Sequence, residues 1–155
     1  MEKRLDLTIS GSHLWLRARD CEDAELEMGE GNRAQGLRWD NGIAVMDPLS
    51  DEEFGADVIV RTPARFSADK RAQRTLKIPF TVPEGGELIL GSPEEELPVG
   101  IALAAGDYTL MFEVCVARDV FYTLSLLPGK LDTASAHKAD GWGLKKDQTL
   151  PSGMF

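Results

Sequence analysis

Hydrophobic and polar residues alternate along most of this chain, and a period of two is the pattern of β-strands with one buried face. Leu5, Leu7 and Ile9 alternate with polar residues near the start. From Tyr108 to Val116 every second residue is aromatic or aliphatic. Strand-like runs lie at 5–9, 13–17, 43–46, 57–62, 75–82, 87–90, 99–103, 108–116 and 120–127. These runs predict a protein built mainly of strands.

Turn-forming residues separate the runs. Asn41-Gly42 indicates a tight turn, because both residues adopt positive φ at little cost. Pro83–Gly86 is expected to join its two flanking runs as a hairpin. Pro79 lacks an N–H donor, which indicates an edge strand or a bulge. Short helical turns are expected only at 67–74 and 50–54.

About 8–10 short strands with little helix favour an all-β fold, an antiparallel β-sandwich with Greek-key-like connections. Tyr108 follows a tight loop, and a tyrosine in that place often bonds back to the preceding backbone in such folds; a plain core role is the alternative. We assign residues 1–130 to the sandwich and 131–155 to an irregular C-terminal tail packed on or beside it. Trp142 and Phe155 are the expected anchors of that tail.

The chain has 155 residues, enough for one domain, with 26 acidic and 17 basic residues and a net charge of −9. This balance argues against direct binding to nucleic acid or to an anionic membrane, since both need cationic surface. It permits a basic protein as partner. No apolar run is as long as a membrane span, and the first residues lack a signal-peptide pattern, so we expect a cytoplasmic protein.

Catalytic and metal-binding motifs are scarce. The two histidines, His13 and His137, have no serine or cysteine motif beside them. Cys21 and Cys115 lack metal-site spacing, and Cys115 is expected to be a buried free thiol. No glycine-rich loop precedes a helix. We therefore predict no enzyme activity, no cofactor and no metal, and leave a calcium site built from loops of the sandwich as an alternative.

The charges are unevenly distributed. The segment from Asp20 to Asp57 holds twelve acidic and two basic residues, a local net charge of −10, and six of these acids lie in 20–30. The segment from Arg61 to Lys77 carries a net charge of +5. An acidic run of this kind is either a solvated face or a docking surface for a basic protein.

Short motifs recur in order at 7–10, 13–16, 35–45, 76–82 and 103–110. The most specific are the strand ending in Pro-Phe-Thr-Val and the later strand that begins Gly-Asp-Tyr. Over about residues 5–116, this arrangement resembles the competence protein J family, small proteins that inhibit a DNA-entry nuclease. The family implies a non-enzymatic inhibitor, and the same chemistry would serve an immunity protein that neutralises a nuclease toxin.

Carboxylates can compete with DNA phosphates for the same Lys and Arg side chains. We therefore predict that acidic loops bind a basic nuclease. Trp39 is a candidate anchor residue for that partner, and burial in the hydrophobic core is the alternative for its side chain. The predicted partner-binding residues are Glu22, Asp23, Glu25, Glu27, Glu30, Trp39, Asp40, Asp51, Glu52 and Glu53. Alternatives are a ligand-binding module for carbohydrate or calcium-linked lipid, and an enzyme using scattered acids. A homodimer through the Pro79 edge is also left open.

Overall fold

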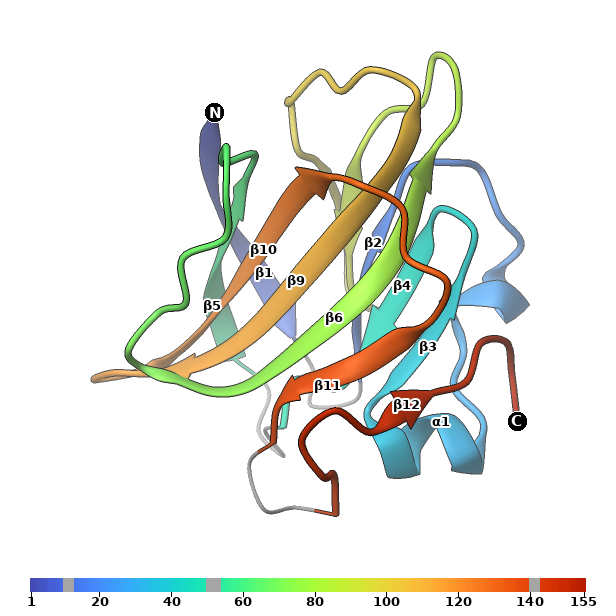
Figure 1. Cartoon of the computed structure of the whole chain (residues 1–155). Coiled ribbons are helices and arrows are strands. Elements are labelled where there is room, and N and C mark those ends of the chain that lie inside the picture. The colour runs from blue at the N-terminus through green and yellow to red at the C-terminus, as the bar shows by residue number, and fades with distance from the viewer. Residues whose placement is uncertain (10–12, 50–53, 140–142) are drawn as a thin grey trace.

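Two β-sheets stack on one another in the computed structural model, which describes residues 1–9, 13–49, 54–139 and 143–155 (Figure 1). The larger sheet has the order β1 (Glu2–Ile9), β5 (Phe54–Arg61), β10 (Val120–Pro128), β9 (Gly106–Val116), β6 (Ala72–Val82), β11 (Ala134–Lys138) and β12 (Thr149–Leu150). The smaller sheet has the order β3 (Leu37–Asp40), β4 (Ile43–Met46), β2 (Leu14–Arg17), β7 (Ile89–Gly91) and β8 (Glu96–Pro98). Two short helices, η1 (Asp23–Leu26) and α1 (Glu30–Gln35), precede β3. The all-β prediction is confirmed.

The core lies between the two sheets and is filled by the alternating residues of both. Leu76 of β6 pairs with Phe112 of β9, which in turn pairs with Leu124 of β10, and all three are fully buried. The Phe112 and Tyr122 rings stack with their centroids 5.9 Å apart. Residues on one face of each strand therefore meet across the interior, as expected for packed sheets.

Two local predictions from the sequence are confirmed. The Tyr108 hydroxyl donates a hydrogen bond of 2.7 Å to the carbonyl oxygen of Ala104, so the tyrosine does pin the loop before β9. Gly42 adopts a φ of 76° in the turn that joins β3 and β4, where Asp40 pairs with Ile43. Both features involve residues that are close together in the sequence, which explains why local sequence patterns predict them.

The prediction of a hairpin at Pro83–Gly86 is wrong. The turn exists, because the Gly86 N–H donates to the carbonyl oxygen of Pro83. However, β6 belongs to the seven-stranded sheet and β7 to the five-stranded sheet, so the turn carries the chain from one layer to the other. Turn-forming residues determine that the chain reverses direction locally. They do not determine which strand the next strand pairs with.

Two further local predictions are also wrong. The expected helical turns at 67–74 are absent, since β6 begins at Ala72 and its first residues pair with the end of β9. This pairing outweighs the weak helical preference of a polar segment. The run at 99–103 forms no strand; Val99 and Ile101 are buried there without a ladder. The helical turn expected at 50–54 lies mostly outside the described residues.

Pro79 lies in an interior strand, in a part of β6 that β11 does not cover. In the described part of the chain, β11 pairs with β6 at Thr75, Leu76 and Lys77 and does not reach Pro79, so that side of β6 is an edge there. β6 as a whole is not an edge strand, but Pro79 lies on a part of it that is uncovered on one side. A homodimer through this edge stays a prediction.

The prediction of an irregular segment at 131–155 needs correction. β11 pairs with β6, β12 pairs with β11, and Leu144 and Leu150 are buried in the main core. The Trp39 indole N–H donates to the carbonyl oxygen of Leu150 at 2.8 Å. The segment therefore completes the seven-stranded sheet. Trp142, expected to anchor it, lies outside the described residues.

Phe155 holds the end of this segment against α1 through its backbone and not through the expected burial of its ring, because the residue is 51% exposed. Its carbonyl oxygen accepts hydrogen bonds from the N–H groups of Gly31 and Asn32, at 2.9 and 3.3 Å. A Cβ atom at Gly29 would collide with the backbone carbonyl of Phe155, so this position requires glycine for the close approach, whereas a Cβ atom at Gly31 would meet only the Phe155 ring. The last residues of the segment thus lie beside the acidic run.

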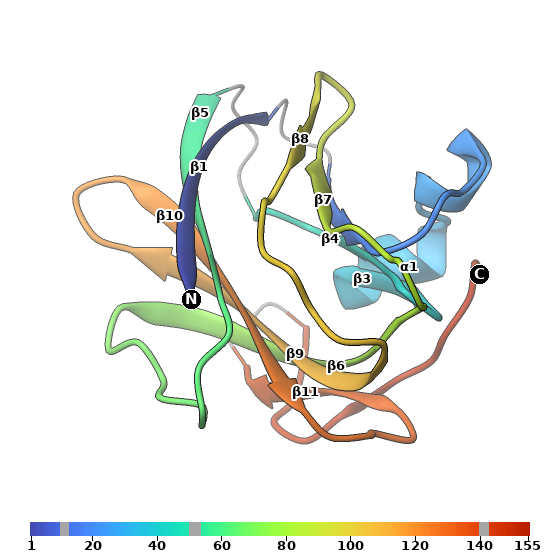
Figure 2. The same ribbon diagram turned by 90° about the horizontal axis from the view of Figure 1, so that it is seen from above.

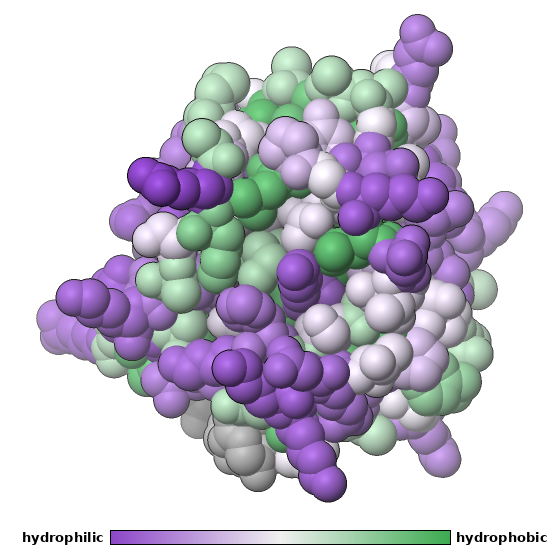
Figure 3. Space-filling model, in the orientation of Figure 1, coloured by the Kyte–Doolittle hydropathy of each residue, from purple (hydrophilic) through white to green (hydrophobic). Residues whose placement is uncertain are grey.

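The outer face of the seven-stranded sheet carries hydrophilic side chains around small hydrophobic spots (Figure 3). Beneath them, Glu113 is fully buried, and its carboxylate accepts hydrogen bonds from the Thr123 hydroxyl at 2.7 Å and the Asp69 N–H at 2.9 Å. The bond from Asp69 holds the basic β5–β6 loop to the sheet. Cys115 is a buried free thiol, as predicted, and burial raises its pKa to about 12. Neither helix in the described part of the chain is long and apolar enough to cross a membrane.

Candidate partner-binding surface

The acidic run at 20–30 is packed against the outer face of the five-stranded sheet. Figure 2 shows the segment with η1 on the side of that sheet that faces away from the larger sheet. Leu26 and Met28 are buried there against Trp15, Ile43 and Val45. Because apolar residues alternate with Glu25 and Glu27, one side of the segment packs on the sheet and the other carries carboxylates.

An open groove of about 560 Å³ separates η1 from the turn between β7 and β8. The turn is closed by reciprocal backbone hydrogen bonds between Ser92 and Glu95. Acidic residues from both sides line the groove, with aromatic rings beside them. The lining residues are His13, Trp15, Asp23, Leu26, Glu27, Ser92, Pro93, Glu94, Glu95 and Glu96.

The Glu96 carboxylate is already hydrogen-bonded to other side chains of the protein. Its carboxylate accepts hydrogen bonds from Arg17 Nε and Trp15 Nε1, each at 2.8 Å. The hydrogen bond from Arg17 lowers the pKa of Glu96, burial opposes this shift, and the Trp15 bond adds to it. Glu96 thus joins β8 to β2 and is less available to a partner than the other acids of the groove.

His13 lies next to Trp15, with ring centroids 5.5 Å apart. Burial lowers the pKa of His13, and the nearby Arg33 lowers it further. The imidazole is therefore mainly neutral at pH 7 and does not offset the carboxylates of the groove.

The structure places the predicted residues in three groups. Glu22, Asp23, Glu27 and Glu30 are exposed, and Asp23 and Glu27 face the groove. Glu25 is occupied within the segment: its carboxylate accepts from the Glu22 N–H at 2.8 Å and from Arg19 at 3.2 Å, and these bonds lower its pKa.

Asp40 and Trp39 do not line the groove. The Asp40 carboxylate is 3.7 Å from Arg38 Nε. Trp39 is 9% exposed and belongs to the core, so it does not offer a ring to a partner. The remaining predicted residues, Asp51, Glu52 and Glu53, lie outside the described residues.

Glu94 and Glu95 were missed as members of this surface. They lie about 70 positions from the acidic run, and only the pairing of β2 with β7 brings the two segments together. The sequence signal is the Glu94-Glu95-Glu96 run between the expected strands at 87–90 and 99–103, but no local pattern shows where this run lies in the fold. We call Glu22, Asp23, Glu27, Glu30, Glu94 and Glu95 the acidic surface.

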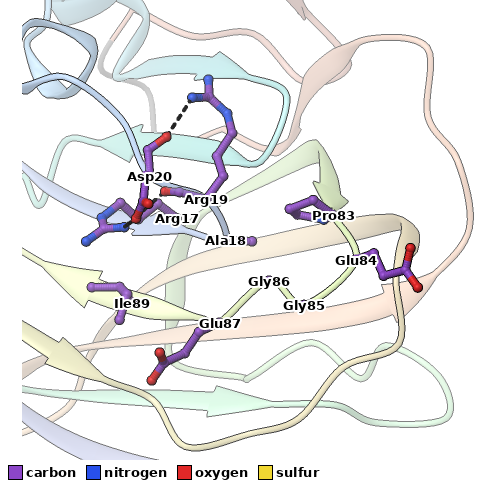
Figure 4. A pocket seen from close by; sticks show the side chains of 10 residues that line it. All are labelled: Arg17, Ala18, Arg19, Asp20, Pro83, Glu84, Gly85, Gly86, Glu87 and Ile89. Carbon is purple, nitrogen blue, oxygen red and sulfur yellow. Dashed lines mark hydrogen bonds and ion pairs between the residues drawn. The ribbon is translucent and has the colours of Figure 1, made fainter.

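A second hollow, of about 520 Å³, lies between Arg17–Asp20 and the Pro83–Glu87 loop (Figure 4). Arg19 extends away from that loop, and Glu84 points to another side, so the charged groups do not converge on a common point. Among the described residues, no group of three or more His, Cys, Asp or Glu side chains is arranged to hold a metal ion.

Residues 6–127 match the family model of Competence protein J (ComJ). The chain belongs to the competence protein J family. No curated protein matches the sequence. Among solved structures, the fold is similar to that of ComJ from Bacillus subtilis, an inhibitor of the DNA-degrading activity of NucA. The TM-score is 0.67 at 15% identity, covering 82% of this chain and 96% of that one.

The fold is also similar to that of a protein described as Crocagin biosynthetic gene J. In that case the TM-score is 0.57 at 13% identity, with 84% of this chain and 98% of the other covered. The two identities are low, so these structures establish the shared fold alone.

Proposed function

We propose that this protein is a non-enzymatic inhibitor of a bacterial nuclease and that its acidic surface binds a basic region of that enzyme. Family membership supports the inhibitor role, since ComJ from Bacillus subtilis inhibits the DNA-degrading activity of NucA. The observation that carries the binding mode is the groove, where carboxylates from two distant segments face one another.

The physical basis is competition for cations. A nuclease binds DNA through Lys and Arg side chains that contact phosphates, and carboxylates can occupy the same donors. Exposed ion pairs contribute only about 0–1 kcal/mol each, so the acidic surface would act collectively, by steering the encounter and fixing its orientation. The buried packing of Leu26 and Met28 holds the carboxylates in place for this role.

The carbohydrate- or lipid-binding alternative gains no support from the tryptophans. Such a module would need exposed aromatic rings, and Trp15 and Trp39 are only 6% and 9% exposed. Trp142 lies outside the described residues. No specific observation favours a second function.

A nuclease assay with charge-reversal variants tests the proposal. The protein is titrated into a DNA-degradation assay with a secreted or competence-associated nuclease from the same bacterium. Glu27→Lys/Glu94→Lys changes one residue on each side of the groove, and Asp119→Lys/Asp132→Lys makes the same charge change at exposed positions outside the acidic surface.

We expect the groove variant to be a weaker inhibitor than the wild type by about tenfold or more. The control variant should inhibit like the wild type. Equal inhibition by wild type and the groove variant would overturn the acidic binding mode. Equal weakening by both variants would show that net charge matters and the groove does not. Absence of inhibition by the wild type, across the nucleases of that bacterium, would overturn the inhibitor role itself.

A further inference from the structure

Arginine side chains lie under the acidic run, and one of them is buried. Arg38, on β3, is 8% exposed, so its charge is not presented to solvent or to a partner. It is one of only two basic residues between Asp20 and Asp57. Its position on the outer face of the five-stranded sheet places it directly beneath η1.

The guanidinium of Arg38 binds the backbone of the acidic run at two points. Its Nη1 donates hydrogen bonds to the carbonyl oxygens of Ala24, at 2.9 Å, and Glu27, at 2.7 Å. Both carbonyls lie toward the C-terminal end of η1, and that of Ala24 also accepts the Glu27 N–H at 3.4 Å. A cation at that end also interacts favourably with the helix dipole.

We propose that Arg38 is a positioning residue, which fixes the acidic surface in a binding-ready arrangement by holding the backbone of residues 24–27 to the sheet. This inference rests on the proposed function. Arg38 contacts no partner. It acts through Asp23 and Glu27, whose carboxylates line the groove on the segment that it holds.

Arg19 supports the same arrangement from another side. Its Nη2 donates to the Glu25 carboxylate at 3.2 Å, and its Nε donates to the carbonyl oxygen of Asn41 at 2.7 Å. The acidic run is therefore tied both to β3 and to the β3–β4 turn. Both arginines also place positive charge among closely spaced carboxylates, which reduces their mutual repulsion.

Ordering residues 24–27 before the nuclease binds increases the affinity of the complex. A segment that must be ordered during binding loses conformational entropy at that step, and this loss weakens the complex. A lysine at position 38 would keep the charge, but it lacks the planar guanidinium, in which Nη1 donates both hydrogen bonds while Nε lies 3.7 Å from the Asp40 carboxylate. We therefore expect lysine to hold the segment less well than arginine does.

Three variants of the full chain test this inference: Arg38→Met, Arg38→Lys and the control Arg118→Met, which removes an exposed arginine of the β9–β10 turn. Hydrogen exchange is followed at the amides of Glu25 and Glu27, which are hydrogen-bonded within the segment. Exchange in β9 and β10 reports on the integrity of the sandwich. Inhibition of the nuclease is measured in parallel.

We expect Arg38→Met to exchange at least tenfold faster at Glu25 and Glu27, with β9 and β10 unchanged, and to inhibit about tenfold more weakly. Arg38→Lys should fall between it and the wild type, and Arg118→Met should match the wild type. If Arg38→Met does not fold, Arg38→Lys provides the comparison.

Unchanged exchange at Glu25 and Glu27 would overturn the inference, as would faster exchange with unchanged inhibition. If the wild type inhibits no nuclease, the proposed function fails. Faster exchange confined to the segment would still support the role of Arg38 in holding it.

Discussion

The hydroxyl of Tyr108 links the start of β9 to the loop that precedes it. The side chain is 9% exposed, and its hydroxyl donates to a carbonyl only four residues earlier, on Ala104. The bond thus closes a short loop at the edge of the core. Its energetic contribution is that of one partly buried hydrogen bond, because the ring remains packed when the hydroxyl is removed.

Replacing Tyr108 with phenylalanine should lower the free energy of unfolding by about 1 kcal/mol. The Ala104 carbonyl would lose its donor, and the phenyl ring would still fill its place. Urea titration followed by tryptophan fluorescence measures the change. Thr109→Val, which removes an exposed hydroxyl bond on the same strand, should change the free energy by about 0.5 kcal/mol or less. Equal stability of Tyr108→Phe and the wild type would contradict the assigned bond.

At the scale of elements, the β7–β8 turn and β2 are held together by Glu96. Arg17 and Trp15 both donate to its carboxylate, so one side chain connects two strands beneath the groove. The pKa of Glu96 is lowered in the folded state, chiefly by the Arg17 hydrogen bond. A lowered folded-state pKa means that the interaction stabilises the fold above the ordinary value near 4.5, and that this contribution is lost as the pH falls below it.

The wild type should therefore lose more stability between pH 6 and pH 3 than Glu96→Gln does, because the glutamine variant lacks the ion pair at both values. Melting temperatures recorded across this range by circular dichroism measure the difference. Glu95→Gln removes a charge from the adjacent residue and should follow the wild-type curve. Parallel curves for the wild type and Glu96→Gln would contradict the prediction.

The candidate site was only half predictable from the sequence. The acidic run at 20–30 is visible as a local excess of charge, and its exposed carboxylates are where the prediction put them. Glu94 and Glu95 were not assigned to it, because their place depends on β7 pairing with β2. Trp39 is next to an acid in the sequence, but alternation along β3 turns it into the core.

At the scale of the whole molecule, the last 25 residues complete the fold. Leu144 and Leu150 are at most 5% exposed, and β11 covers part of the edge of β6. Burial of each leucine contributes roughly 1.5–3 kcal/mol, which is large relative to the roughly 5–15 kcal/mol that stabilises a typical domain. The sandwich therefore extends past residue 130.

A chain ending at residue 130 should be strongly destabilised, by several kcal/mol, and should aggregate through the uncovered part of β6. Circular dichroism melting and size-exclusion chromatography would detect both effects. Met154→Ser in the full chain changes an exposed residue of the same segment and should leave the melting temperature within about 2 °C. A monomeric 1–130 fragment that melts like the full chain would contradict this prediction.

Local patterns in the sequence predicted many local features of this protein. Alternation located most of the strands, although it missed β3, β8, β11 and β12 and wrongly included 99–103. The Asn41-Gly42 and Tyr108 patterns indicated a turn and a loop, and the charge count located an acidic segment. Which strands are neighbours depends on contacts between distant parts of the folded chain. These contacts place β6 and β7 in different sheets, add β11 to the larger sheet, and bring Glu94 opposite Glu27. Strand pairing joins residues far apart in the chain, so no local pattern encodes it.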